Sequence, residues 1–371
     1  KTSNPASHFR QALQGPECAF PEPDSAIDLE LLQDWHDFCR IKGLKYDRNR
    51  EATASQWDTL TEIAAAGRAS PRFDGVKWGG VIDRPRDLIV AHVNQRNSRD
   101  FRWSRNYFEP PHAFRVTFLD QTADYQQRER VIPWPGHVGP ITVTEQLPLV
   151  GKTDPDEIWI EARRRQYEIM HRPDRFSAVQ DGAVRTATRG DWVKGSYDTL
   201  ERTMSAHRVT AVRGNTVTLD GWVEMETGNA YAVRFMRQVG EGNEATFESV
   251  LRQVTFAEGL TDSIGVTGIG PLPEIGDLVQ FGIAGQESSD LVVAGTQAGE
   301  AMTSVLTMLA AAPIIDELTD AEVPPPWNGR AGSESDVGAA VPAVPKVVAI
   351  IPFFDADGDP DGLQVLLEPG A

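Results

Sequence analysis

The clearest pattern of apolar and polar positions runs through residues 189–281. Over residues 231–236 large apolar side chains occupy every second position, which is the period of a β-strand. Two β-rich runs, residues 207–212 and 216–220, flank the pair Gly214-Asn215. Gly and Asn adopt positive φ at low cost, so the pair predicts a tight hairpin turn. No catalytic motif falls in this stretch, and we interpret it as a structural framework.

A spacing of three or four between apolar positions predicts helices elsewhere. The expected helices are residues 6–13, 28–40, 53–67 and 154–171. Asn4-Pro5 and Asp154-Pro155 are typical helix starts, because Asn and Asp cap free N–H groups and Pro suits the first helical position. Gly67 is expected to end the third helix.

Further alternation predicts more strands and turns. Residues 71–78 read as a hairpin in which Asp74-Gly75 forms a type I′ turn. Residues 84–112 lack periodicity and read as extended segments and loops. Four more strands are expected, at residues 114–119, 128–132, 290–294 and 302–309. On propensity alone, residues 302–309 could also form a helix.

The chain is therefore predicted to be an α+β protein, rich in β-structure, with a few packed helices. We expect a mixed α/β domain over residues 1–112 and a β-rich domain over residues 113–320. The second domain holds the helix at 154–171 and an inserted hairpin region at 200–280. A Pro-, Gly- and Ser-rich linker covers residues 321–344, and residues 345–371 have the length of one hairpin.

Composition narrows the class of protein. The 371 residues are 40% hydrophobic and 24% charged, as in soluble globular proteins, and no apolar run is long enough to cross a membrane. The formal charge of -18 argues against nucleic-acid binding, which needs a basic surface. Cys18 and Cys39 are expected to be buried and unpaired. The first residue is Lys, and we expect the chain to be a fragment of a longer protein.

Candidate chemistry is sparse. The seven histidines and two cysteines show no metal-ligand spacing, and no phosphate-binding or nucleophile motif is present. The Gly-rich residues 264–270 read as a flexible loop. Residues 355–361 resemble the front of a calcium loop, but Pro360 replaces its Gly, so a solvated turn is favoured over weak calcium binding. We therefore predict no catalytic, cofactor-binding or metal residue, no cofactor and no enzymatic activity.

Three further features have two interpretations each. The run Arg163-Arg164-Arg165 is interpreted as a solvated or partner-facing patch rather than a phosphate site. Arg189-Gly190-Asp191 matches a cell-adhesion tripeptide, but a tight turn before a strand is favoured. A carboxylate pair for glycoside hydrolysis would need two acids close in space. The sequence gives no reason to choose Glu145 or Glu161 for that role.

The order of these segments resembles the tail-tip or hub proteins of long-tailed phages. The similarity is to the central part of the lambda-type tip attachment protein, also called host specificity protein J. The segments that carry it are Asn4-Pro5-Ala6, Trp57-Asp58-Thr59-Leu60, residues 81–85 (Val-Ile-Asp-Arg-Pro), residues 114–120, the helix from Asp156, residues 189–193, residues 208–212 with 218–220, and Ile314-Ile315-Asp316. Residues 345–371 resemble the start of a fibronectin type III module.

The resemblance implies a structural virion protein built of hub-type β-barrel or sheet domains. Such a hub forms a homotrimer at the distal end of the tail tube and contacts other tail-tip and tail-tube proteins. It contributes to host attachment through downstream receptor-binding regions and to DNA ejection. DNA then passes through its channel without specific binding, and no stable membrane insertion is expected. The location implied is the phage tail tip.

Two alternatives belong to other classes. One is a tail-associated enzyme that cleaves carbohydrate or peptidoglycan, and the other is a bacterial surface adhesion module. A pocket holding two carboxylates about 5–10 Å apart would favour the enzyme. A signal peptide preceding residue 1 in the full gene would favour the adhesion module.

Overall fold

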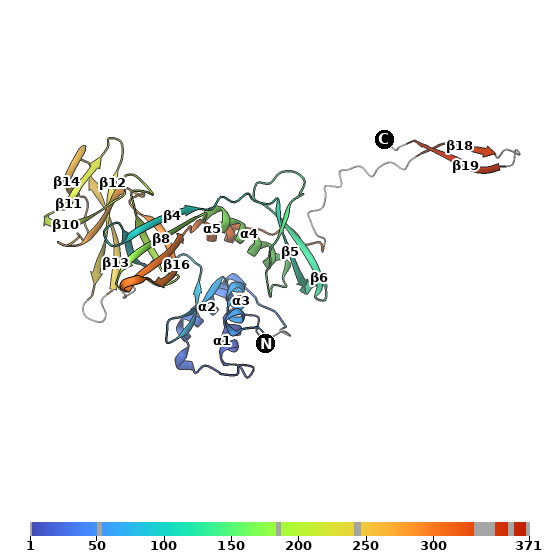
Figure 1. The fold of residues 1–371 in the computed structure, drawn as a ribbon, viewed down its shortest axis with the longest axis horizontal. Helices are drawn as coiled ribbons and strands as arrows, with labels where there is room; N and C mark the ends of the chain where they lie inside the picture. Colours follow the sequence, from blue (N-terminus) through green and yellow to red (C-terminus); the bar gives the residue numbers. More distant parts are fainter. Residues whose placement is uncertain are drawn as a thin grey trace. The chain divides into compact units, whose positions relative to one another are not determined.

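The computed structural model describes residues 2–49, 54–182, 187–240, 246–329, 346–354 and 360–368. The chain divides into two compact units, Lys1–Asn328 and Gly329–Ala371. The fold is α+β and rich in β-structure, as the sequence predicts. Figure 1 labels the helices and strands.

The first unit begins with three helices and a hairpin. They are α1 (Pro5–Gln14), α2 (Leu29–Lys42), α3 (Gln56–Ala66), β1 (Ala69–Phe73) and β2 (Trp78–Ile82), with a short 3-10 turn at Asp24–Ala26. All three expected helices are confirmed, and the Asn4 side chain caps α1 by accepting from the Ala6 N–H. Their apolar faces meet around Trp35, whose indole N–H donates to the Gly67 carbonyl at 2.9 Å.

The turn between β1 and β2 corrects the prediction of a two-residue type I′ turn. The strands pair up to Phe73 and Trp78, which leaves a four-residue connection. Asp74 Oδ1 accepts from the Val76 and Lys77 N–H groups, and Gly75 has φ +101°. The Asp74 side chain accepts the hydrogen bonds that close this longer loop. The Asp-Gly pair therefore predicted the hairpin correctly but not its turn type.

A three-stranded sheet and helix α4 follow. Strands β5 (Ala113–Asp120), β6 (Gln126–Pro133) and β7 (Thr144–Gln146) lie in the order β6-β5-β7, with a 3-10 turn at Gln121–Ala123. Helix α4 (Pro155–His171) packs on this sheet, where Ile158 and Ala162 join Val116 and Ile132 in a buried cluster. The strand pair at 114–132 and the helix at 154–171 are thereby confirmed.

A six-stranded sheet lies beside this helix. Its order is β3-β9-β16-β17-β8-β4, all antiparallel except β3 with β9. The strands are β3 (Ile89–Asn94), β4 (Arg99–Arg105), β8 (Asp174–Asp181), β9 (Trp192–Ser196), β16 (Ser289–Ala298) and β17 (Thr303–Ala310). The segment at 302–309 is thus a strand and not a helix. A 3-10 turn at Glu300–Met302 precedes β17, and helix α5 (Ile314–Ala321) follows it.

A closed barrel is inserted between β9 and β16, which are neighbours in that sheet. The strands are β10 (Ser205–Arg213), β11 (Thr216–Met225), β12 (Tyr231–Val239), β13 (Thr246–Thr255), β14 (Gly259–Val266) and β15 (Leu278–Ile283), in the order β10-β11-β14-β13-β12-β15. The predicted hairpin at Gly214-Asn215 joins β10 to β11, and Gly214 has φ +56°. The Gly-rich residues 264–270 are only partly a loop, because Ile264 and Val266 are buried on β14.

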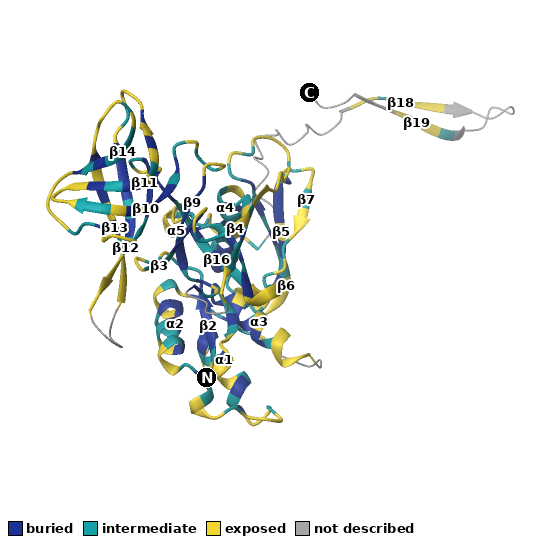
Figure 2. Ribbon diagram, turned by 60° about the vertical axis from the view of Figure 1, so that its left-hand side comes forward, coloured by how far each residue is buried: buried dark blue, intermediate teal, exposed yellow. Residues whose placement is uncertain are grey.

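Strands β12 and β13 extend beyond the barrel as a two-stranded ribbon. They pair from Tyr231 with Val254 to Val239 with Thr246. Strand β15 pairs with β12 only as far as Phe235, and β14 pairs with β13 only at residues 254–255. The outer part of the ribbon is exposed in Figure 2.

The two cysteines and the turn at Arg189-Gly190 can be compared directly with the predictions. Cys39 is buried, and burial raises the pKa of its thiol to about 12, whereas Cys18 is only partly buried, against the prediction. Residues 189–190 form a turn. The sequence favoured this interpretation of Arg189-Gly190-Asp191 over a cell-adhesion tripeptide. Gly190 has φ +89°, and a Cβ at this position would lie 2.1 Å from Val81 Cγ1. Only glycine fits there.

In the second unit the described residues form an antiparallel hairpin, β18 (Lys346–Phe354) and β19 (Pro360–Glu368). The calcium-loop-like residues 355–359 lie outside the described residues, as does most of the expected linker from residue 330 to 345.

Candidate functional site: the charged face of helix α4

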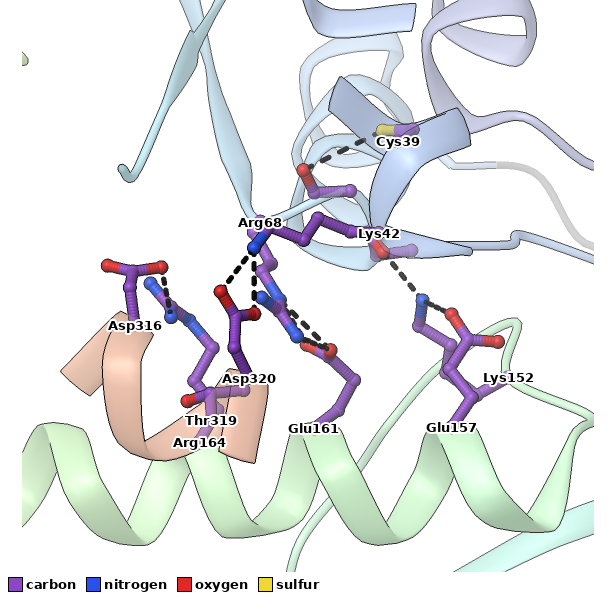
Figure 3. A network of polar contacts seen from close by, with 12 residues as sticks. Cys39, Lys42, Arg68, Lys152, Glu157, Glu161, Arg164, Asp316, Thr319 and Asp320 are labelled. Carbon is purple, nitrogen blue, oxygen red and sulfur yellow. Dashed lines mark hydrogen bonds and ion pairs between the residues drawn. The ribbon is translucent and has the colours of Figure 1, made fainter. Parts of the chain in front are cut away.

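Helix α4 carries charged residues at helical spacing on one face. Glu157, Glu161, Arg164, Glu168 and Arg172, at the C-cap, are separated by four, three, four and four positions, so they share a side of the helix. We call these five residues the charged stripe. Figure 3 shows Glu157, Glu161 and Arg164 projecting from α4 toward the N-terminal segment and α5.

Glu157, Glu161 and Arg164 of the stripe are buried and the other two residues are partly buried, which corrects the interpretation of the arginine run as a solvated patch. Arg163 and Arg164 are 9% and 2% exposed, and only Arg165 lies on the surface. Arg163 turns to another side of α4, where it donates to Glu322 and Pro133. Three charged neighbours in sequence therefore have three different environments.

Two carboxylates of the stripe bind cations, Glu161 one from a distant segment and Glu157 one from just before the helix. Glu161 accepts from Arg68 Nη2 at 2.6 Å and from Arg68 Nε at 3.0 Å. Glu157 accepts from Lys152 Nζ and from the Lys45 N–H. Charged groups in low dielectric are tolerated only with partners of this kind.

Arg164 and Arg172 converge on acidic residues outside the helix. Arg164 Nη1 lies 2.8 Å from Asp316 on α5, and its Nη2 lies 3.1 Å from Asp83 at the end of β2. Arg172 donates to both carboxylate oxygens of Asp83, at 2.8 and 3.0 Å. The stripe thus ties the N-terminal hairpin and α5 to α4.

Burial and ion pairing act in opposite directions on these carboxyls. Burial alone would raise the pKa of Asp83, but Arg172 and Arg164 outweigh it and the pKa is lowered. Burial opposes the charge of Glu161 in the same way, and Arg68 and Lys152 hold its pKa below the ordinary value. Glu157 differs, because burial raises the pKa of its carboxyl despite the contact with Lys152.

A cavity of about 440 Å³ opens beside the stripe. Its lining comes from β1 and β2, from α4, and from the turn before β9 together with β16. Six arginines and three carboxylates face it: Arg68, Arg84, Arg164, Arg165, Arg172, Arg189, Asp83, Glu161 and Glu168.

The segment after α5 is fastened to the opposite side of α4. Glu322 accepts from Trp159, Arg163 and Tyr167. The Arg130 guanidinium lies 5.1 Å from the ring centre of Trp159 and 5.2 Å from that of Trp327. These contacts hold residues 322–327, near the start of the expected linker, against α4 and β6 within the first unit.

The two acids considered for glycoside hydrolysis have different positions. Glu145 is exposed on β7, and Glu161 is buried in its pair with Arg68. Among the described residues no group of three or more His, Cys, Asp or Glu side chains is placed to hold a metal ion. Within the same residues, no helix has both the length and the apolar character needed to cross a membrane.

Comparisons with known proteins give one match to report. No family model matches the chain, and no curated protein matches it. Among solved structures, the chain is similar to the tail protein from Neisseria meningitidis MC58, with a TM-score of 0.32 and 14% sequence identity. The match covers 46% of this chain and 58% of that one, so this chain spans less than two thirds of the Neisseria protein.

Proposed function

We propose that this chain is a structural, non-enzymatic component of the tail tip of a phage or phage-like particle. In this proposal it forms a homotrimeric hub at the distal end of the tail tube and takes part in host attachment and DNA ejection. The ordered set of tail-tip-like segments carries the proposal, because several motifs in one order are more specific than any of them alone.

The positions of these segments support the proposal. Asn4-Pro5 starts α1, residues 81–85 end β2, and residues 114–120 lie on β5. Residues 208–220 form the β10–β11 hairpin of the closed barrel. The segments are therefore framework elements of one compact unit, and not isolated surface loops.

Open strand edges support assembly with other subunits. The six-stranded sheet ends in β3 and β4, and beyond the barrel the described part of the β12–β13 ribbon pairs with no third strand. Unpaired edges are places where a second chain adds strands or packs. A ring of identical subunits would use such edges repeatedly.

The state of the buried acids supports a role without catalysis. A general acid works best when its pKa is raised toward neutral pH. Asp83 and Glu161 have lowered pKa values and bind arginines. Glu157 has a raised pKa, but its Oε1 atom is already bonded to Lys152 and Lys45.

The charge of -18 supports a channel through which DNA passes without specific binding, since like charges repel. Other tail-tip and tail-tube proteins, and a host receptor reached through downstream regions, are the proposed partners.

Light scattering with size-exclusion chromatography of the full chain tests the proposal. We expect three times the mass of one chain, with no loss of turbidity when the protein is added to purified peptidoglycan. A monomer at micromolar concentration, or clearing of the peptidoglycan, would contradict the proposal.

A further inference from the structure

Two histidines from different segments meet at one end of the three-stranded sheet. His112 comes directly before β5, and His137 lies in the connection between β6 and β7, which covers residues 134–143. Their rings are stacked, with the ring centres 4.5 Å apart and an angle of 24° between the planes. We call residues 134–143 the histidine loop, because this contact holds the loop against the start of β5.

The backbone of His112 ties down both ends of the histidine loop. Its N–H group donates to the Val143 carbonyl at 3.0 Å, and its carbonyl accepts from the Trp134 N–H at 2.8 Å. Trp134 and Val143 are the first and last residues of the loop. A single residue therefore holds the loop closed at its two ends.

The imidazole of His112 adds a contact that depends on its protonation. Its Nδ1 atom accepts from the N–H groups of Thr142 and Val143, at 3.1 and 3.4 Å. A backbone N–H group can only donate, so Nδ1 carries no proton in the closed loop, and the proton of the neutral ring is on Nε2. The closed loop thus requires a neutral His112.

Protonation of either ring conflicts with the closed loop. A proton on Nδ1 of His112 would point at two N–H groups, and the Thr142 hydroxyl, 3.2 Å away, can accept it only if those groups turn aside. The Nε2 atom of His137 is buried and has no hydrogen-bond partner among the described residues, so a proton there would leave an N–H group unpaired. Positive charges on two stacked rings would also repel each other.

The surroundings offer no carboxylate to offset these charges. The charged residues on the segments around the pair are Glu109, Arg115, Arg130, Glu145, Arg163 and Glu322. The three arginines are paired with acids, and Glu109 and Glu145 are exposed. Within the described part of the chain, the histidines that form ion pairs are His36 and His207, and neither belongs to this pair.

We propose that the histidine loop is a pH-sensitive switch, which is closed while His112 and His137 are neutral and opens when they take up protons. The open loop frees Nδ1 of His112, so the open state binds more protons and acid favours it. Opening withdraws the Trp134 ring, which is 8% exposed and lies 5.3 Å from the ring centre of Phe114, and so uncovers an aromatic surface. The switch does not depend on the proposed role in a tail.

Hydrogen–deuterium exchange of the full chain, followed by mass spectrometry, tests the switch. Each exchange rate is divided by the intrinsic rate at the same pH, which gives a protection factor. Between about pH 8 and about pH 5, where imidazoles ordinarily change charge, we expect protection of the histidine loop to fall by at least about tenfold. Amides in the barrel should keep their protection. Unchanged protection of the loop, or an equal loss throughout the chain, would overturn the proposal.

Three variants assign the response to the pair. His112→Asn places an amide oxygen where Nδ1 accepts and cannot titrate, so the loop should stay protected at both pH values. His137→Phe keeps a stacked ring but removes the second charge, so the loss of protection in acid should be smaller. His171→Gln is the matched control, because it removes a histidine of α4 that lies outside the pair, and it should respond as the unmodified chain does.

The variants also separate a switch from a merely structural contact. A full acid response in His112→Asn, or a lost response in His171→Gln, would contradict the assignment. If His112→Asn fails to protect the loop even at pH 8, His137→Phe decides, because that variant keeps the acceptor at residue 112. An unchanged response in His137→Phe would then overturn the proposal.

Discussion

The barrel interior and the charged face of α4 are buried to a similar degree but are built from opposite kinds of side chain. The barrel is filled by residues such as Val217, Leu219 and Phe235, each at most 3% exposed. On α4, Glu161 and Arg164 are 9% and 2% exposed and meet other charges. The degree of burial alone therefore does not determine whether a packing surface consists of apolar or charged side chains.

The two regions should respond differently to change. Apolar burial contributes about 25 cal/mol per Å² and does not depend on the protonation of neighbours. Buried ion pairs contribute little net stability, because desolvation offsets attraction, but removing one partner leaves an isolated charge. We thus expect the barrel to depend on volume and the α4 junction to depend on matching charges.

Glu161→Ala should have the largest effect. It leaves the Arg68 guanidinium buried without its carboxylate, which costs about 3–5 kcal/mol. Urea denaturation followed by tryptophan fluorescence measures the loss in the free energy of unfolding.

The double variant Arg68→Met with Glu161→Leu removes both charges and is the control for this effect. Its loss should be much smaller than that of Glu161→Ala. If the double variant is at least as unstable as the single one, the pair is not acting through charge.

Leu219→Ala should have the next largest effect. Deleting a buried side chain in the closed barrel leaves a cavity and costs about 2–5 kcal/mol. Leu119→Ala is the matched control on β5, where Leu119 is 51% exposed, and it should change the free energy of unfolding by no more than about 0.5 kcal/mol. Similar losses in both variants would contradict the packing of the barrel.

His92 gives an effect that is absent at neutral pH and grows as the pH falls. It lies on β3 and its Nε2 atom is 2.8 Å from Ser249 Oγ on β13. Burial, with Arg234 and Lys194 nearby, lowers the pKa of His92 to about 3. The folded state thus keeps the ring neutral while the unfolded chain takes up a proton near pH 6.5.

This difference in pKa between the folded and unfolded states sets the direction in which stability changes with pH. The contribution of His92 to the free energy of unfolding is fully present above pH 6.5. It falls by about 1.4 kcal/mol per pH unit as the pH decreases toward 3. His92→Gln should remove this slope between pH 6.5 and 4 in urea denaturation. Asp83 and Glu161 act in a lower window, because their lowered pKa values remove stability only below about pH 4. An unchanged slope in His92→Gln would show that the ring titrates freely.

The sequence predicted the elements better than their assembly. Periodicity located the four long helices, and Gly214 marked the β10–β11 hairpin because only a short turn with positive φ fits there. A barrel was expected only from the resemblance, as one of two options, and the alternation pattern itself did not indicate its closure. Strand β15 pairs with both β10 and β12, and such long-range pairing leaves no signal in local alternation.

The candidate site was missed for a related reason. Charged runs usually face solvent, so Arg164 was interpreted as exposed. The spacing of Glu157, Glu161, Arg164 and Glu168 was a usable signal, because it places four charges on one side of a helix. Their partners were not predictable, since Arg68 and Asp316 lie 93 and 152 residues from the groups they bind.

Electron cryo-microscopy of an assembled particle that carries this chain tests the central claim most directly. The account predicts three copies around the axis at the distal end of the tail tube, with barrels and open sheet edges contributing to contacts between subunits. Density for the chain elsewhere in the particle, or a channel wall lined by Lys and Arg at this position, would contradict it.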